Sequence, residues 1–295
     1  MVFFFMIENF LEYLSVERRY SKHTVESYQR DLVDFETYVQ QIKKNWKNID
    51  KKDLRNYLMQ LSEAGNKPKT INRKMSAIRS FFKFLIYIDY ISQNPASHIK
   101  SLKLPKEVNI PISESEIDQL LNRSFFDETW IGDRDFLLIQ LLYETGIRRA
   151  ELIGINISDI DFEQKQIKVL GKRNKERIIP VRDELLQHVK TLIQNSPFSK
   201  TCAALFTTER GKRIYPKLVY NIVISYLRLV TNKKKVSPHV LRHSFATNML
   251  SHGAEINAVK EILGHSSLAS TQVYTHNDIN QLKKVFNKAH PREKK

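Results

Sequence analysis

The chain has 295 residues, enough for two domains, and its 41% hydrophobic and 27% charged residues exclude a disordered protein. Its 48 Lys+Arg against 32 Asp+Glu give a net charge of +16, which favours a polyanionic partner, nucleic acid before a membrane surface. The single cysteine, Cys202, excludes an intramolecular disulfide. The apolar start "MVFFFMI" is too short to span a bilayer and lacks a basic leader region, so we expect a cytoplasmic protein without membrane insertion.

Residues 1–100 are predicted to form a helical domain, because apolar residues recur there at helical spacing. Ser21 and Asp50 are suited to cap two of its helices, and Gly65 to end one in the left-handed conformation. The predicted helical segments are residues 6–18, 25–42, 51–65 and 70–91.

The fourth segment carries cations beside its apolar stripe, namely Arg73, Lys74, Arg79 and Lys83. One interpretation is a solvated face, and the other is a face laid against DNA phosphates. The sequence favours the two interpretations equally.

A proline-containing stretch without periodicity, residues 101–112, is predicted to be a linker, and residues 113–295 a second domain. Ser113 and Glu116 predict a capping box, and a long apolar helix is expected to end at Gly146. Two short β-like runs, "KQIKVLG" and "RIIPV", flank "KRNKE" and predict a hairpin with a basic tip. Helical patterns are predicted again from residue 216 to the end, so the fold is predicted to be mainly α with a small β-sheet.

The stretch "SPHVLRHSFATNML" places His239, Arg242 and His243 at the start of a helix. The spacing of the two histidines suits zinc, but Val240 stands where a zinc protease needs Glu, so we reject that site. A core histidine beside a salt-bridged arginine is the plain structural alternative. The third interpretation is oxyanion binding, because His239 and Arg242 are neighbours near a helix N-terminus and arginine fits a phosphate bidentately.

Other residues supply what a phosphate reaction needs. Arg148 precedes Glu151 by three positions, which suits an arginine oriented by a carboxylate. Lys172 lies in the hairpin tip, His265 follows a glycine that suits a helix end, and Tyr274 comes nine residues later. No acidic cluster suits a two-metal site, so we expect neither metal nor cofactor, and arginines would carry the transition-state charge.

Four stretches in this order resemble the tyrosine recombinases, the phage-integrase family, and within it the Xer branch. They are "TGIRRAELIGI", "GKRNKERIIPV", "SPHVLRHSFATNML" and "ILGHSSLASTQVYTH", and the likeness also covers "SKHTVESYQRDL" near the N-terminus. The resemblance implies a four-helix, SAM-like core-binding domain followed by a tyrosine-recombinase catalytic domain, the two clamping DNA.

The resemblance also implies a mechanism. Tyr274 is the nucleophile and forms a 3′-phosphotyrosyl link, while Arg148 and Arg242 bind the non-bridging oxygens. Lys172 protonates the leaving 5′-hydroxyl. A covalent intermediate conserves the phosphodiester energy, so neither ATP nor a metal is needed.

The two histidines complete the implied site. His239 acts as acid or base toward Tyr274 and the phosphate, and His265 adds a hydrogen bond. Arg173 stands where the family usually has glycine, which leaves Lys175 as an alternative to Lys172. Arg149 is likewise an alternative to Arg148, and His243 is assigned to packing.

The function implied is Xer-type resolution of chromosome dimers at cell division. An integrase of a mobile element shares the chemistry; a chain that starts directly at the core-binding helices favours the Xer branch. A topoisomerase and a non-catalytic DNA-binding protein are weaker alternatives. The expected partners are double-stranded DNA, a second copy or a paralogous recombinase in a tetrameric synaptic complex, and an activating cell-division protein.

Overall fold

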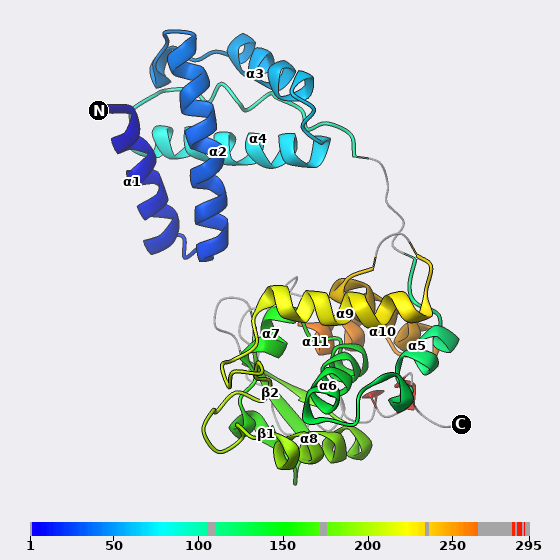
Figure 1. Cartoon of the computed structure of the whole chain (residues 1–295). Coiled ribbons are helices and arrows are strands. Elements are labelled where there is room, and N and C mark those ends of the chain that lie inside the picture. The colour runs from blue at the N-terminus through cyan, green and yellow to red at the C-terminus, as the bar shows by residue number, and fades with distance from the viewer. Residues whose placement is uncertain are drawn as a thin grey trace. The chain divides into compact units, whose positions relative to one another are not determined.

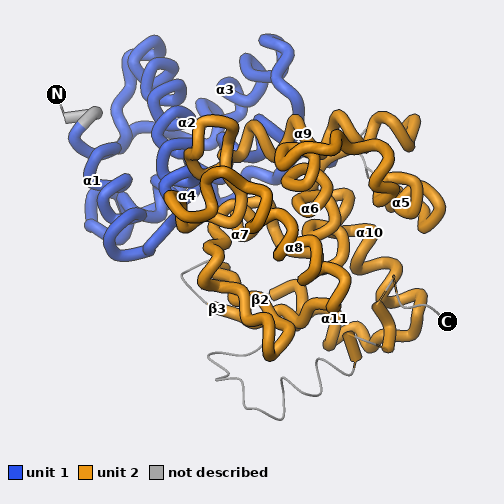
Figure 2. The backbone as a smooth tube through the Cα atoms, turned by 60° about the horizontal axis from the view of Figure 1, so that its bottom comes forward, with its two compact units in different colours: residues 1–107 blue, residues 108–295 orange. Residues whose placement is uncertain are grey.

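The computed structural model describes residues 2–104, 110–171, 176–233, 236–264, 285–286, 288–290 and 292. The chain divides into two compact units, residues 1–107 and 108–295 (Figure 2). Each unit has its own hydrophobic core.

Unit 1 is helical throughout, and its helices are seen in Figure 1. They are α1 (Val2–Val16), α2 (Lys22–Gln41), α3 (Lys51–Glu63) and α4 (Pro68–Tyr87), with a 3-10 turn η1 (Trp46–Asn48). The first helix begins at Val2 rather than at the predicted Met6, so it includes the apolar residues before Met6. Ser21 accepts a hydrogen bond from the Thr24 amide, and Asp50 forms a capping box, as predicted. Gly65 has the predicted left-handed backbone, with φ of 76°.

The core of unit 1 is built largely from aromatic rings. Phe81 lies edge-on to Phe10 at 5.5 Å and to Trp46 at 5.1 Å between ring centroids. These three side chains are fully buried together with Phe35 and Phe82. Edge-to-face packing suits the ring quadrupoles and so favours one arrangement of these helices.

The cations of α4 mostly hold partners inside unit 1, which neither interpretation of the sequence anticipated. Arg73 donates to Asp31, and Lys74 is paired with Asp31 and Asp34 of α2. The Arg79 guanidinium donates to the backbone oxygens of Ala96 and Ile99 at 3.3 and 2.8 Å. Lys83 is exposed, and it is the one of the four that forms no hydrogen bond or ion pair with another described residue.

Unit 2 contains seven helices and a three-stranded antiparallel sheet among its described residues. The helices are α5 (Glu114–Leu120), α6 (Trp130–Thr145), α7 (Arg149–Gly154), α8 (Asp183–Asn195), α9 (Pro216–Val230), α10 (Pro238–Ser251) and α11 (Ile256–Leu263). The strands are β1 (Ile160–Asp161), β2 (Gln166–Leu170) and β3 (Glu176–Pro180), in the order β1-β2-β3. Two 3-10 turns add η2 (Arg123–Phe125) and η3 (Ile157–Asp159). The mainly helical class with a small sheet is thus confirmed.

The predicted hairpin is confirmed in β2 and β3, which pair from Gln166 opposite Pro180 to Leu170 opposite Glu176. Its basic tip, residues 172–175, lies outside the described residues. Helix α8 follows the hairpin and was not foreseen from the sequence.

Helix α6 is the centre of unit 2, with α8, α9 and α10 packed around it (Figure 1). Leucines and isoleucines on every side of α6 are fully buried, as expected of a helix that is apolar all round. The helix ends at Gly146, whose φ of 60° confirms the predicted left-handed cap. A Cβ at this glycine would lie 2.6 Å from the Phe245 ring and 2.7 Å from Leu263, so glycine lets the ends of α6 and α11 approach α10 closely.

The beginning of unit 2 is fixed to α10. Ser113 and Glu116 form the predicted capping box of α5. The Ile112 amide donates to the buried hydroxyl of Ser244 at 2.7 Å.

Among the described helices, none is long and apolar enough to cross a bilayer.

Candidate active site

Arg148 lies at the N-cap of α7, two residues after Gly146, the left-handed end of α6. Its Nη1 donates to the Glu151 carboxylate at 2.8 Å, and its backbone amide donates to the same carboxylate at 2.7 Å. The predicted arginine–glutamate relation is therefore present, and the carboxylate fixes both ends of the arginine. Arg149 instead donates to the carbonyl of Pro216, which favours Arg148 as the functional arginine.

Arg242 lies one turn into α10 and bridges the ends of two other helices. Its Nη1 donates to the Gly146 carbonyl at 2.5 Å, and its Nη2 donates to the Leu263 carbonyl at 2.7 Å. Burial and the nearby positive charge of Arg148 lower the pKa of Arg242 to about 10. It stays cationic at neutral pH, and a partly buried cation near another cation attracts an anion strongly.

His239 is the second residue of α10 and its side chain is exposed, so the core-histidine alternative is wrong. Partial desolvation of the ring at this surface position, together with the positive charges of Arg149, Arg242 and Arg148, lowers its pKa and so favours the neutral imidazole. His243, which we assigned to packing, is also exposed.

The C-terminus of α11 gathers the arginines of the site. Three successive carbonyls there each accept a hydrogen bond from a different arginine. Ile262 accepts from Arg177 at 3.2 Å, and Leu263 accepts from Arg242 at 2.7 Å. Gly264, the capping residue, accepts from Arg148 at 3.1 Å. Carbonyls at a helix C-terminus carry partial negative charge and lack partners in the helix, so they suit cations.

Glu151 is the anionic partner at the centre of this cluster. Burial alone raises the pKa of this carboxyl, but hydrogen bonds and charge from Arg177 and Arg148 outweigh it and lower the pKa to about 2. The carboxylate is therefore ionised throughout the neutral range and can hold both guanidinium groups.

Sequence reasoning missed Arg177. The available signal was an arginine on the core face of a predicted strand, two residues before Ile179, where an apolar residue is usual. Its partner Glu151 is 26 residues away, a separation that the local pattern does not reveal.

The structure brings together Arg148 and Arg242, and places His239 on the helix of Arg242. Lys172, His265 and Tyr274 lie outside the described residues, as do Arg173 and Lys175 of the hairpin tip. The described part of the chain holds no cluster of His, Cys, Asp or Glu that would bind a metal ion. What the described residues offer is a pair of anchored guanidinium groups suited to an oxyanion.

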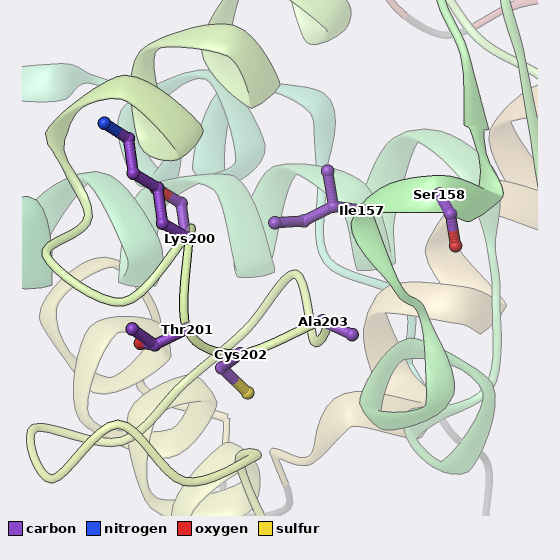
Figure 3. Close-up of a pocket in the computed structure, with 7 residues that line it drawn as sticks. Ile157, Ser158, Lys200, Thr201, Cys202 and Ala203 are labelled. Carbon is purple, nitrogen blue, oxygen red and sulfur yellow. The ribbon is translucent and has the colours of Figure 1, made fainter.

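The pocket drawn in Figure 3 is a separate feature. It is lined by Ile157 and Ser158 and by residues 199–203, and neither site arginine lines it. Cys202, its sulfur-bearing residue, is partly exposed.

This helical fold, with two arginines anchored for an anion, is matched by two family models. Residues 111–281 match the phage integrase family, and residues 7–87 match the N-terminal SAM-like domain of phage integrases. The chain belongs to the phage integrase family.

Its relatives within the family are tyrosine recombinases. The chain is 35% identical to tyrosine recombinase XerC of Syntrophus aciditrophicus, over 97% of both chains. It is also 35% identical to tyrosine recombinase XerD of Oceanobacillus iheyensis, over 98% of this chain and 99% of that protein.

Solved structures agree with the family. XerH site-specific recombinase bound to its difH substrate aligns with a TM-score of 0.65 at 25% identity, over 88% of this chain and 78% of that one. The integrase of the Tn1549 transposon with circular intermediate DNA aligns with a TM-score of 0.68 at 22% identity, over 93% and 98%, and shows the shared fold.

Proposed function

We propose that this chain is a Xer-type site-specific tyrosine recombinase that cuts and rejoins double-stranded DNA. The hydroxyl oxygen of Tyr274 attacks the scissile phosphorus, the bond to the 5′-oxygen breaks, and a 3′-phosphotyrosyl link forms. The leaving 5′-oxygen takes a proton from Lys172. Attack of a 5′-hydroxyl from another strand reverses these steps and frees the tyrosine, so the phosphodiester energy is kept.

The observation that carries this proposal is the shared anchorage of two guanidinium groups. Arg148 and Arg242 are fixed to neighbouring carbonyls, those of Gly264 and Leu263. Two arginines so fixed would bind the two non-bridging oxygens of one phosphate and stabilise the charge that develops on them, without reorganisation during the reaction.

The histidines complete the proposed site. A neutral His239, with its pKa lowered by partial desolvation of the ring and by the arginines, is able to accept the proton of the attacking tyrosine. His265 directly follows the end of α11 in the sequence, and we assign to it a hydrogen bond to the phosphate.

We propose the resolution of chromosome dimers at cell division as the biological role. Four protomers, of this chain alone or with a paralogous recombinase, would hold two DNA sites, and an activating cell-division protein would control them. The reaction would take place on chromosomal DNA in the cytoplasm. The similarity to XerC and XerD over nearly the whole chain supports this role over integration of a mobile element.

A nicked suicide substrate tests the chemistry. The wild-type protein is expected to trap a covalent protein–DNA adduct, and Tyr274→Phe to bind the DNA equally but form no adduct, since only the nucleophilic oxygen is lost. An adduct with the phenylalanine variant would show that another residue is the nucleophile. Mapping the binding site on the host chromosome separates a chromosomal dimer-resolution site from the end of a mobile element.

A further inference from the structure

We infer that Arg177 is a positioning residue of the recombination site, which sets the orientation of Arg148 through the shared carboxylate of Glu151 and through the end of α11. The inference rests on the proposed function. Arg177 lies on β3, in the second position after the hairpin tip, and its side chain is 7% exposed. A side chain buried to this extent has little surface with which to contact DNA.

The first support is the hydrogen bonding of the two Glu151 carboxylate oxygens. Oε1 accepts from Arg177 Nη1 and from Arg148 Nη1, both at 2.8 Å. Oε2 accepts from Arg177 Nη2 at 2.9 Å and from the backbone amide of Arg148 at 2.7 Å. Each oxygen thus serves both arginines. The bidentate grip of Arg177 fixes the plane of the carboxylate, and that plane determines where the guanidinium of Arg148 lies.

The second support is at the end of α11. Arg177 Nε donates to the Ile262 carbonyl at 3.2 Å, and a Cβ on Gly264 would be 3.1 Å from Arg177 Cδ. The same helix end offers its next two carbonyls to Arg242 and Arg148. Arg177 therefore contacts both groups that hold Arg148, namely the Glu151 carboxylate and the C-terminal end of α11.

Loss of Arg177 would leave Glu151 with half of its donors while the carboxylate stays buried. Arg148 would be the one remaining cation in direct contact with Glu151, and Arg242 would act only at longer range. Burial of the carboxyl would then raise the pKa of Glu151, because fewer cations oppose its effect. A protonated Glu151 holds Arg148 poorly, so the error in position grows as the pH falls.

The experiment compares single-turnover cleavage and DNA affinity for Arg177→Lys, Arg177→Gln and a matched control. The control is Arg134→Gln. Arg134 is also buried in unit 2, at 3% exposed, and it pairs with the Asp135 carboxylate and donates to the Thr207 carbonyl. None of these partners belongs to the site. Thermal unfolding verifies that each variant is folded, and Arg177→Lys, which keeps the charge, serves if Arg177→Gln fails to fold.

Both Arg177 variants are expected to bind DNA as the wild type does and to cleave about 10²-fold more slowly, the cost of a misplaced catalytic group. Cleavage by Arg177→Gln should also rise with pH over a range in which wild-type Glu151 is fully ionised, whereas Arg177→Lys keeps a cation beside Glu151 and should show a smaller pH dependence. Arg134→Gln should cleave within about twofold of the wild type, since buried surface away from the site does not set catalytic geometry. Wild-type cleavage rates in the Arg177 variants, or equal losses in the Arg134 control, would overturn the inference.

DNA with sulfur in place of the leaving 5′-oxygen separates two routes, because Arg177 also lies on the hairpin to whose tip Lys172 belongs in the sequence. A thiolate leaves without a proton, so sulfur should not rescue an Arg177 variant whose fault lies at Arg148. Rescue would show that Arg177 acts through the hairpin lysine and would overturn the inference. Absence of any adduct with the wild-type protein would instead refute the proposed function itself.

Discussion

The guanidinium of Arg148 donates to the carbonyl oxygen of Gly264, a residue 116 positions further along the chain, at 3.1 Å. The bond joins the beginning of α7 to the end of α11. The place where α11 ends therefore determines the position of an arginine that we assign to the scissile phosphate, and Gly264 is the residue that ends it.

Gly264→Ala is expected to slow DNA cleavage as well as to destabilise the fold. The residue has a φ of +64°, and the added Cβ would lie 3.1 Å from Arg177 Cδ, so either the helix end or the Arg177 side chain must give by a few tenths of an ångström, and both take part in positioning Arg148. Gly253→Ala is the matched control, since its φ is +85° but a Cβ there meets nothing within 4 Å. Both should lose about 1–2 kcal/mol of unfolding free energy, and only the first should lose cleavage. Equal cleavage rates in the two variants would separate α11 from the chemistry.

Lys172→Ala should slow cleavage of ordinary DNA about 10²–10⁴-fold, the usual contribution of a general acid. Sulfur at the leaving 5′-position should restore its rate, because a thiolate leaves without a proton. The same sulfur should not restore Arg148→Ala or Arg242→Ala, whose function is at the non-bridging oxygens. Single-turnover cleavage of the two substrates measures this.

Lys175→Ala is the control for the hairpin. If only this variant is rescued by sulfur, the acid is Lys175 and Arg173 has altered the tip. If neither lysine variant is rescued, the proton comes from another group, and His239 is the next residue to test.

The affinity for non-specific duplex DNA should fall steeply with salt. A protein of net charge +16 that makes about 6–10 phosphate contacts would lose on the order of a thousandfold or more in affinity between 50 and 200 mM salt, since binding releases counterions. Titration of a labelled duplex at several salt concentrations gives the slope. A flat response would mean that the charge of the chain does not serve DNA binding.

Stability should depend on pH through His290, which is fully buried. Its Nε2 donates to the Glu144 carbonyl at 3.0 Å, and its Nδ1 accepts from the Arg292 amide at 3.2 Å, so a second proton has no acceptor there. Burial lowers the pKa of His290 to about 3. The unfolded chain takes up that proton near pH 6.5, so this contribution to stability is complete above pH 6.5 and is lost as the pH falls toward 3.

The difference in unfolding free energy between the wild type and His290→Asn should shrink by about 2 kcal/mol from pH 7 to pH 5. Denaturant unfolding at a series of pH values measures it. The opposite effect of Glu144, whose pKa burial raises to about 6, is common to both proteins and cancels in the difference. His23→Asn is the control for replacing a histidine by asparagine, because that side chain is 94% exposed and its removal disturbs no buried hydrogen bond.

The sequence predicted best where the signal is local. A glycine after an apolar helix marks the end of α6 at Gly146, and the spacing of Ser113 and Glu116 marks the capping box of α5. The relation of Arg148 to Glu151 spans three residues of one helix start and was also predictable. In each case both partners lie within one turn, so the pattern of residue types contains the contact.

Contacts between distant segments were not predictable from the same patterns. Arg177 meets Glu151 from another element, and Arg73 meets Asp31 across two helices. The backbone acceptors at the end of α11 have no sequence signature, because every residue carries a carbonyl group. The predicted roles of Lys172 and Tyr274 stay predictions, since both lie outside the described residues.

Since the acceptors at the end of α11 are backbone oxygens, side-chain replacement at Ile262 or Leu263 cannot remove them. A change in length acts differently. One residue inserted into or deleted from α11 would rotate its end by about 100° and shift it by about 1.5 Å. The three carbonyls would then face away from the arginines that they now hold. The position of the three acceptors therefore depends on the number of residues in α11, whereas the side chains of Ile262 and Leu263 matter for the hydrophobic core in which both are buried.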